Sequence, residues 1–242
     1  YEMLARIGLK NIKINTLKYL THAGGKLEKN KLKEIIKFCK KNNIKFFSMY
    51  GQTEASPRIS YLKPEFSEKK IGSIGKGIPG NKIYIIDNTG KKILKPFVEG
   101  EIICEGKNVF MGYSKNYKDL KKSNEENYKL KTGDLGYFDK DGFFYITSRI
   151  SKIAKIFGNR VDLGALETLM SQKGYKVACL SDNNKVFIFI EKKYNKTNLI
   201  NTISKITNLN NSSFEIIKLK YFPRTSNNKI SYNELKKINA RL

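Results

Sequence analysis

A strand, a glycine turn, a helix and a second strand follow one another early in the chain, and this order most constrains the fold. Residues 17–20 are predicted to form a short buried strand, which is ended by Gly24-Gly25. Across 28–43, apolar residues recur at helical spacing while lysines fill the opposite face. A second strand is predicted at 45–49. This order predicts an α/β layer with a parallel sheet.

Beyond residue 66 the pattern changes to short strands separated by glycine-containing turns. This pattern is typical of a small barrel or sandwich. The polar stretch at 116–131 is rich in Lys and Asn and is expected to be an exposed connection. We therefore interpret residues 1–150 as one domain, with an α/β part at about 1–65 and a β-rich part at about 66–150. The expected strands of the β-rich part lie at 82–87, 101–105 and 142–147.

A smaller α+β domain is predicted at 151–242. Two of its apolar runs flank the turn Asp182-Asn183-Asn184, which indicates a β-hairpin. The fold class expected for the whole chain is α/β plus a β-rich subdomain, followed by this small α+β domain. Its expected elements are helices at 163–172, 198–209 and 232–240 and strands at 176–181, 185–192 and 215–222.

The chain carries 47 Lys and Arg residues against 22 Asp and Glu, a formal net charge of +25. Only six of the basic residues are arginines, and the lysines are spread along the chain beside many Asn and Ile residues. Base recognition and bidentate phosphate contacts favour arginine. We therefore predict no nucleic-acid partner, although the positive field would attract anionic ligands such as nucleotides.

Other residue counts narrow the chemistry further. No apolar run reaches the ~18–20 residues that span a bilayer, so no transmembrane segment is predicted. The three cysteines lie far apart without metal-like spacing, as expected of a cytoplasmic protein with reduced thiols. His22 is the only histidine, which excludes a multi-histidine metal site.

The densest group of candidate functional residues is Tyr50-Gly51-Gln52-Thr53-Glu54, directly after the second predicted strand. Ligand-binding loops of α/β folds follow the carboxyl ends of parallel strands. An aromatic ring can stack on a base, a glycine permits close approach, a hydroxyl can contact phosphate and a carboxylate can bind Mg²⁺. The alternative is a polar turn with a half-buried tyrosine.

Further polar candidates follow along the chain. Asp134, after the segment 131–133, can accept hydrogen bonds from both hydroxyls of a ribose, as acidic residues after a strand do in dinucleotide sites. A turn aspartate is the alternative. The remaining candidates are Arg149, Ser151, Gly158, Arg160 and Lys229.

The order and spacing of these motifs resemble one family, the acyl-adenylate-forming ligases, which include acyl-CoA synthetases, peptide-synthetase adenylation domains and luciferases. The resemblance runs from about residue 17 to about residue 235. Each motif alone is modest, but many occur in register. Besides 50–54 and Thr132-Gly133-Asp134, they are Gly24-Gly25, the segments 72–80, 100–102, 108–113 and 158–161, Glu167, and Pro223-Arg224-Thr225 with Lys229.

In this family ATP and a carboxylic acid form an acyl-adenylate and pyrophosphate, and a thiol then accepts the acyl group. The resemblance therefore implies ATP and Mg²⁺ as cofactors. It also implies a carboxylic acid substrate and a thiol acceptor, either coenzyme A or the phosphopantetheine of a carrier protein. The residues implied for the nucleotide site are Gly24, Gly25, Lys26, Tyr50, Gly51, Gln52, Thr53, Glu54, Asp134, Arg149 and Lys229.

Individual roles are carried over from the resemblance. Tyr50 would stack on adenine, Thr53 would contact the α-phosphate and Glu54 would hold Mg²⁺. Gly24, Gly25 and Lys26 would line the nucleotide and acyl pocket, mainly through the backbone. Asp134 would bind both ribose hydroxyls, with Arg149 beside it.

The resemblance also assigns the C-terminal domain the role of a lid that rotates between the two half-reactions. Lys229 resembles its catalytic lysine, whose ammonium would bridge the substrate carboxylate and the phosphate oxygens as charge develops. The hinge position falls on Ser151, where the family usually has Asp or Lys. Gly158 and Arg160 are expected near the channel for the thiol.

The main departure from the family is the absence of the upstream Ser/Thr/Gly-rich loop that binds the β- and γ-phosphates. We therefore expect the chain to be the C-terminal half of a truncated adenylate-forming fold. It would need the missing N-terminal half, or a partner chain, and would be inactive alone.

Three functions stay open. Segments 106–109 and 111–113 look more like stand-alone acyl ligases, so an acyl-CoA or acyl-carrier-protein synthetase is favoured. An amino-acid-activating adenylation enzyme is the second. The third is a split or degenerate half that only binds nucleotide or a partner chain. The sequence does not predict the acyl substrate.

Overall fold

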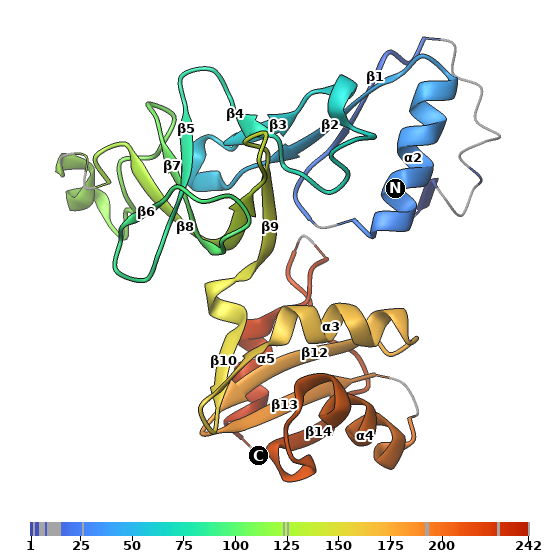
Figure 1. The fold of residues 1–242 in the computed structure, drawn as a ribbon. Helices are drawn as coiled ribbons and strands as arrows, with labels where there is room; N and C mark the ends of the chain where they lie inside the picture. Colours follow the sequence, from blue (N-terminus) through green and yellow to red (C-terminus); the bar gives the residue numbers. More distant parts are fainter. Residues whose placement is uncertain are drawn as a thin grey trace. The chain divides into compact units, whose positions relative to one another are not determined.

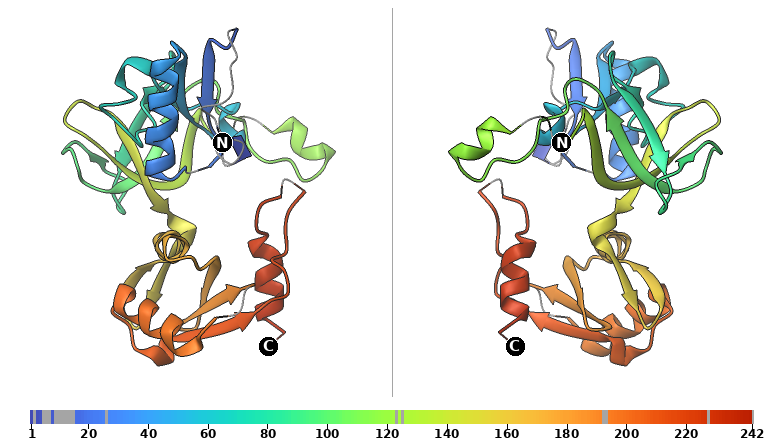
Figure 2. Two further views of the ribbon diagram at one scale, coloured as in Figure 1. Left: turned by 90° about the vertical axis from the view of Figure 1, so that its right-hand side faces the viewer. Right: turned by 90° about the vertical axis from the view of Figure 1, so that its left-hand side faces the viewer.

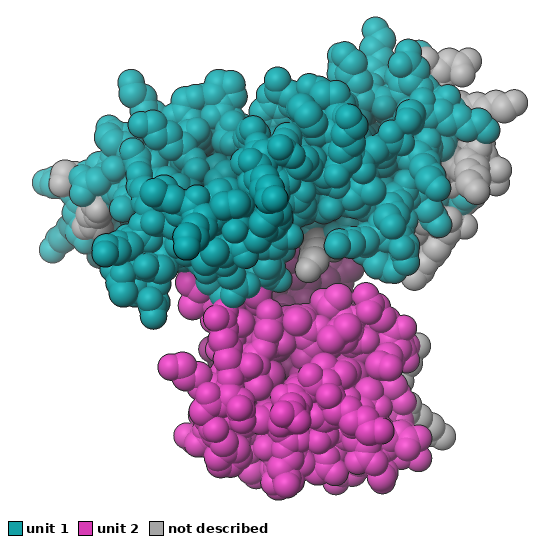
Figure 3. All heavy atoms as spheres, in the orientation of Figure 1, with its two compact units in different colours: residues 1–147 teal, residues 148–242 magenta. Residues whose placement is uncertain are grey.

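The computed structural model describes the chain except for residues 2, 5–7, 9–15, 26, 123, 125, 192–193, 227 and 242. Lys26, predicted to line the nucleotide pocket, lies outside the described residues. The chain divides into two compact units, Tyr1–Thr147 and Ser148–Leu242 (Figure 3). Among the described residues, no helix combines the length and apolar character needed to cross a membrane.

The first unit begins with a mixed sheet in the order β1-β2-β3-β4. β1 is parallel to β2, whereas β2 and β3, and β3 and β4, are antiparallel. The predicted parallel α/β pair is therefore present. The first strand begins at Tyr19, not at residue 17, because Leu17 packs against the core beside the sheet without joining the strand. The bounds are β1 Tyr19–His22, β2 Lys45–Tyr50, β3 Ser60–Leu62 and β4 Lys76–Gly77.

Helix α2, Lys29–Lys41, lies beside β1 and β2 (Figure 1). Its apolar face carries Leu32, Ile35, Ile36 and Cys39, which are all buried and pack in one cluster with Phe46 of β2. Lys40 and Lys41 lie in the last turn, where positive charge is favourable to the helix dipole. The helix therefore forms where its apolar spacing predicted.

The rest of the first unit is one open sheet in the order β6-β5-β7-β8-β9. Of the predicted barrel or sandwich, the closed barrel is therefore wrong, since among the described strands no pairing joins β6 to β9. The buried side of the sheet instead packs against residues of the first sheet, including Tyr50 and Ile59. The bounds are β5 Lys82–Ile86, β6 Lys92–Ile93, β7 Gly100–Glu105, β8 Lys129–Phe138 and β9 Phe144–Arg149.

The sequence did not predict strand β8, because polar residues occupy its buried positions. Leu130, Thr132 and Asp134 alternate toward the interior, and Thr132 and Asp134 are 7% and 3% exposed. The predicted exposed connection at 116–131 therefore ends earlier than expected, at the start of β8. Before β8 it contains the exposed 3₁₀ helix Tyr117–Lys121.

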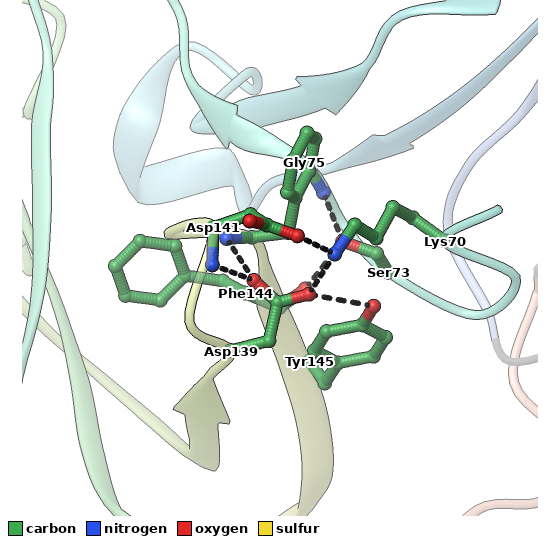
Figure 4. Close-up of polar contacts among 8 residues, drawn as sticks. Lys70, Ser73, Gly75, Asp139, Asp141, Phe144 and Tyr145 are labelled. Atoms are coloured by element: carbon green, nitrogen blue, oxygen red, sulfur yellow. Dashed lines mark hydrogen bonds and ion pairs between the residues drawn. The ribbon is translucent and has the colours of Figure 1, made fainter. Parts of the chain in front are cut away.

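A charged cluster fixes the turn between β8 and β9 (Figure 4). The Lys70 ammonium contacts Asp139 at 2.7 Å and also Asp141. Asp139 Oδ1 accepts from the amides of Asp141 and Phe143, both at 3.0 Å, and Oδ2 accepts from the Tyr145 hydroxyl. Lys70 thereby joins the segment before β4 to the β8–β9 turn.

This cluster predicts a pH-dependent contribution to stability. Burial raises the pKa of Asp139, but the hydrogen bonds from Lys70 and the two amides outweigh it, so the net pKa is lowered. A carboxylate with a depressed pKa stabilises the fold above its unfolded pKa of ~3.9, and this contribution is lost as the pH falls through the folded pKa. We expect Lys70→Met to lower the urea midpoint at pH 7 and to lower it much less at pH 3. Lys69→Met, an exposed neighbour, is the control. An equal effect of Lys70→Met at both pH values would contradict the assignment.

The second unit contains a three-stranded sheet in the order β12-β13-β14. β12 and β13 form the predicted antiparallel hairpin, and β13 is parallel to β14. Alternate residues face opposite sides: Cys179 and Ile188 pack against α3 and α4, while Ala178 and Phe189 pack against α5. Figure 2 shows α5 on the other side of the strands from α3 and α4. The bounds are α3 Leu163–Gln172, β12 Val177–Asp182, β13 Lys185–Ile190, α4 Lys196–Thr207, β14 Phe214–Lys218 and α5 Tyr232–Asn239.

Glu167 of α3 connects the start of this unit to its core. Its Oε1 accepts from Lys152 Nζ at 2.9 Å, from the Cys179 amide at 2.7 Å and from the Tyr232 hydroxyl at 2.9 Å. The Lys152 ammonium also lies 3.3 Å from the centre of the Tyr232 ring. The segment entering the unit is thus tied to α3, β12 and α5.

Candidate functional site

The first part of the candidate site lies where β1 and β2 end. Because these strands are parallel, their carboxyl ends meet at one edge of the sheet. Gly24-Gly25 follows β1, and Tyr50 is the last residue of β2. An added Cβ at Gly24 or Gly25 would meet no described atom within 4 Å, so this loop leaves open space around its backbone.

Tyr50, Gln52 and Asp134 form a hydrogen-bonded group at this edge. The Tyr50 hydroxyl donates to Asp134 Oδ2 at 2.6 Å, and the Gln52 amide donates to the same oxygen at 3.0 Å. Gln52 also donates to the Thr132 carbonyl at 2.7 Å. Asp134 is 3% exposed. Burial, reinforced by the Asp134 carboxylate, raises the pKa of Tyr50 far above its usual range, so the phenol stays protonated and donates.

An irregularity in β8 places Asp134 at this point. Glu101 pairs with Leu135 and Ile103 with Lys131, so three residues of β8 oppose the single residue Ile102. Gly133 adopts a φ of +69°, which favours glycine. Thr132 Oγ1 donates to the Ile102 carbonyl and accepts from the Asp134 amide, which holds the bulge. Asp134 therefore lies within a bulged strand. The sequence comparison with acidic residues that come after a strand was wrong on this point. Bulges of this kind often re-aim a side chain next to an active site.

The ring of Tyr50 belongs largely to the core. Tyr50 is 9% exposed and packs in a cluster with Ala55, Ile59 and Ile102. The alternative that the sequence left open was a polar turn with a half-buried tyrosine, and the ring is more deeply buried than that. A base stacked on Tyr50 would have to contact the small part of the ring that remains exposed.

Gly51 is required by close packing within the chain itself. A Cβ at this position would lie 1.6 Å from the Pro57 carbonyl oxygen. The close approach predicted for a ligand is thus made by the backbone of Pro57.

We expect Gly51→Ala to lower the free energy of unfolding by about 3 kcal/mol, because the backbone must shift to relieve the overlap. Urea denaturation measures this. Gly25→Ala is the matched control and should change stability by less than about 0.5 kcal/mol, since its Cβ would enter open space. A stable Gly51→Ala variant would show that the turn can open without cost.

Thr53 and Glu54 begin the short 3₁₀ helix Thr53–Ala55. Thr53 is exposed and Glu54 is partly exposed. The Tyr113 hydroxyl donates to Glu54 Oε1 at 2.5 Å. Among the described residues, no group of three or more His, Cys, Asp or Glu side chains is placed to hold a metal ion. One accessible carboxylate still fits Mg²⁺, which typically takes one or two protein carboxylates together with substrate phosphates.

Lys229 lies in a hairpin loop of the second unit. Thr225 and Lys229 are joined by the Thr225 amide donating to the Lys229 carbonyl at 2.8 Å. The Arg224 guanidinium donates to the Asn228 carbonyl at 2.9 Å. Phe222 and Ile230 anchor the base of the hairpin in the core against α5. Lys229 itself is exposed near the tip.

The other predicted residues of the second unit lie at its start. Arg149 ends β9 and is exposed. Ser151 lies in the 3₁₀ helix Ile150–Lys152. Gly158 lies in the turn between β10, Ile153–Ile156, and β11, Asn159–Asp162, and Arg160 is exposed on β11. Phe157 and Gly158 both have positive φ, as in a tight hairpin turn.

The structure thus brings together Tyr50, Gln52 and Asp134 by direct contact, with Gly24-Gly25 at the same sheet edge. Arg149, Ser151, Gly158, Arg160 and Lys229 belong to the other unit. Two residues that the sequence had listed only as parts of motifs, without a role, contribute to the site: Thr132, which shapes the bulge, and Tyr113, which contacts Glu54. Tyr113 lies 59 residues from Glu54 along the chain, so no local pattern could have indicated the contact.

Comparison with known proteins places this chain in a family. Residues 2–114 match the model of the family described as AMP-binding enzyme. The 2-succinylbenzoate–CoA ligase of Bacillus licheniformis is 34% identical over 169 residues, which are 69% of this chain and 34% of the relative. That of Bacillus pumilus is 35% identical over 131 residues, which are 54% of this chain and 26% of the relative.

Solved structures are also similar to this chain. The O-succinylbenzoate coenzyme A synthetase (MenE) of Bacillus subtilis, in complex with ATP and magnesium ion, is similar with a TM-score of 0.70 at 27% identity, covering 97% of this chain and 50% of that chain. The amide bond synthetase McbA of Marinactinospora thermotolerans shares the fold alone, with a TM-score of 0.71 at 17% identity, covering 98% of this chain and 49% of that chain.

The fold and the motifs together are those of one family. The chain belongs to the AMP-binding superfamily of acyl-adenylate-forming ligases, as the resemblance predicted. It spans about half the length of the solved relatives and less than half that of the curated relatives it matches.

Proposed function

We propose that the gene product containing this chain is an AMP-forming acid–thiol ligase. In the first half-reaction a carboxylate oxygen attacks the α-phosphorus of ATP, forming an acyl-adenylate and releasing pyrophosphate. In the second, a thiol attacks the acyl carbon, forming a thioester and releasing AMP. The observation that carries the proposal is the buried Tyr50–Asp134–Gln52 group at the carboxyl edge of β1 and β2, in a chain of the AMP-binding superfamily.

Asp134 is assigned to the ribose of the nucleotide. A carboxylate can accept from both hydroxyls of the ribose diol. Two features of this chain support the assignment of Asp134: the bulge that orients its side chain, and the two donors that hold Oδ2. Gln52 holds Asp134, Tyr50 offers its remaining ring surface to adenine, and Gly24-Gly25 offers open backbone to the nucleotide and acyl groups.

Thr53 and Glu54 are assigned to the phosphate end. The Thr53 hydroxyl can donate to the α-phosphate, and Glu54 is the residue that would hold Mg²⁺. When bound, Mg²⁺ neutralises phosphate charge and thereby eases attack by an anionic carboxylate. Glu54 is accessible enough for this role.

Lys229 is assigned as the catalytic lysine of the first half-reaction. Two anions must approach each other, and an ammonium on a flexible stem lowers their repulsion as charge develops. Its hairpin is anchored at the base and exposed near the tip. Arg149 is assigned beside the ribose, Ser151 to the hinge, and Gly158 and Arg160 to the thiol channel.

The acid and the thiol are proposed from the relatives. The matched 2-succinylbenzoate–CoA ligases make 2-succinylbenzoate the first acid to assay and coenzyme A the first thiol. Amino-acid activation, and a half that only binds nucleotide or a partner chain, are the alternatives.

The gene product, expressed from its own start codon, should be assayed for AMP and pyrophosphate release with ATP, Mg²⁺, coenzyme A and a panel of acids. Thioester formation with 2-succinylbenzoate supports the proposal in full. Turnover only with amino acids would favour the second function. Nucleotide binding without pyrophosphate release from any acid would favour the binding-only function.

A further inference from the structure

Tyr113 contacts the carboxylate that the proposed function assigns to Mg²⁺. Its hydroxyl donates to Glu54 Oε1 at 2.5 Å, across 59 residues of sequence. We infer that Tyr113 is a positioning residue, which orients Glu54 for the cation at the phosphate end of the nucleotide. This inference rests on the proposed function and adds a residue that the motif 50–54 does not contain.

The segment that carries Tyr113 is docked by several hydrogen bonds onto residues 54–58, which begin at the end of that motif. The side-chain amide of Asn108 donates through Nδ2 to the backbone carbonyls of Ala55 at 2.7 Å and Arg58 at 2.8 Å. The Ser56 hydroxyl donates back to the Asn108 carbonyl at 2.9 Å. The Phe110 amide donates to the backbone carbonyl of Glu54 itself at 2.9 Å. Residues 108–110 are therefore held at a fixed place beside the 3₁₀ helix of Glu54.

The ring of Tyr113 is oriented by its neighbour and lies at the surface. Its centroid is 4.8 Å from that of Phe110, at an interplanar angle of 78°, an edge-to-face arrangement that aromatic pairs favour. Tyr113 is 69% exposed. The phenol thus reaches Glu54 from a supported ring, on a side that solvent and a ligand can reach.

A positioned phenol suits a carboxylate that binds a metal ion. A glutamate side chain has several rotatable bonds, so a fixed donor on one oxygen restricts its rotamers. Mg²⁺ demands near-ideal octahedral geometry and keeps few protein ligands, which makes the orientation of each ligand matter. Loss of an outer hydrogen-bond partner typically costs 10–100-fold in metal affinity. Because this phenol is exposed, we expect an effect at the lower end of that range.

The test uses the gene product and measures ATP affinity by calorimetry with Mg²⁺ and with EDTA. Tyr113→Phe removes only the hydroxyl and keeps the ring contact with Phe110. We expect the Mg²⁺ concentration for half-maximal ATP binding to rise about tenfold, with ATP affinity in EDTA and the urea midpoint unchanged. A general structural defect would alter the EDTA affinity and the urea midpoint as well.

Tyr117→Phe is the matched control, since Tyr117 is 75% exposed on the following 3₁₀ helix. It should leave the Mg²⁺ dependence unchanged. The Glu54→Gln variant distinguishes failure of the positioning role of Tyr113 from failure of the assignment of Glu54 to Mg²⁺. If Glu54→Gln removes the Mg²⁺ dependence while Tyr113→Phe does not shift it, or tightens it, the positioning role is overturned. If Glu54→Gln has no effect, the assignment of Glu54 in the proposed function fails, and the role of Tyr113 fails with it.

Discussion

Lys229→Ala should reduce the rate of acyl-adenylate formation by about 10²–10³-fold, the cost of removing one group that stabilises charge in a transition state. The physical reason is that the substrate carboxylate and the phosphate oxygens are both anionic, and in the proposed function Lys229 supplies the cation between them. Thioester formation from a supplied acyl-adenylate should be largely spared, because that step no longer brings two anions together. Acid-dependent exchange between pyrophosphate and ATP measures the first step, and release of AMP from the adenylate measures the second.

Lys236→Ala is the matched control for this experiment, since Lys236 is an exposed lysine of α5 in the same unit. Both half-reactions should proceed at the unsubstituted rate in this variant. Equal loss of both steps in Lys229→Ala would contradict a role confined to adenylation, and unchanged adenylation would remove Lys229 from the site.

Asp134→Ala should affect both nucleotide binding and stability. It removes the acceptor of the Tyr50 hydroxyl and one acceptor of the Gln52 amide, at a position that is 3% exposed. Leaving buried donors unsatisfied costs about 1–3 kcal/mol each, so we expect the free energy of unfolding to fall by about 2–4 kcal/mol. If Asp134 also binds the ribose, ATP affinity should fall by about 10²-fold, as the loss of charge-assisted hydrogen bonds implies.

The two effects can be separated experimentally. Urea denaturation gives the stability, and calorimetric titration with ATP well below the unfolding transition gives the affinity. Asp182→Ala, at an exposed turn of the second unit, is the control and should change the free energy of unfolding by less than about 0.5 kcal/mol. A destabilised Asp134→Ala variant with unchanged ATP affinity would leave Asp134 a structural role alone.

Local patterns predicted much of the fold. Helix α3 has its predicted bounds, and α2 and the β12–β13 hairpin lie within two residues of theirs. In each case the signal is local: an amphipathic period, or a turn sequence between apolar runs. The closed barrel was wrong, because sheet closure depends on which strands pair, and nothing within 82–147 specifies that.

The candidate site likewise has features that the sequence predicted and features that it did not. The sequence proposed the motif 50–54, Asp134 and Lys229 as functional residues, because their residue types, order and spacing resemble those of a family with this chemistry. It did not indicate that Gly51 packs on Pro57, that three residues of β8 oppose Ile102, or that Tyr113 reaches Glu54. The last two features join segments far apart in the chain, and the first depends on how the turn after β2 folds back on itself. Contacts of these kinds exist only once the turn has formed and the sheets have paired and packed. The sequence by itself therefore determined which side chains are available for chemistry, and the tertiary structure decided which of them meet and how each is held.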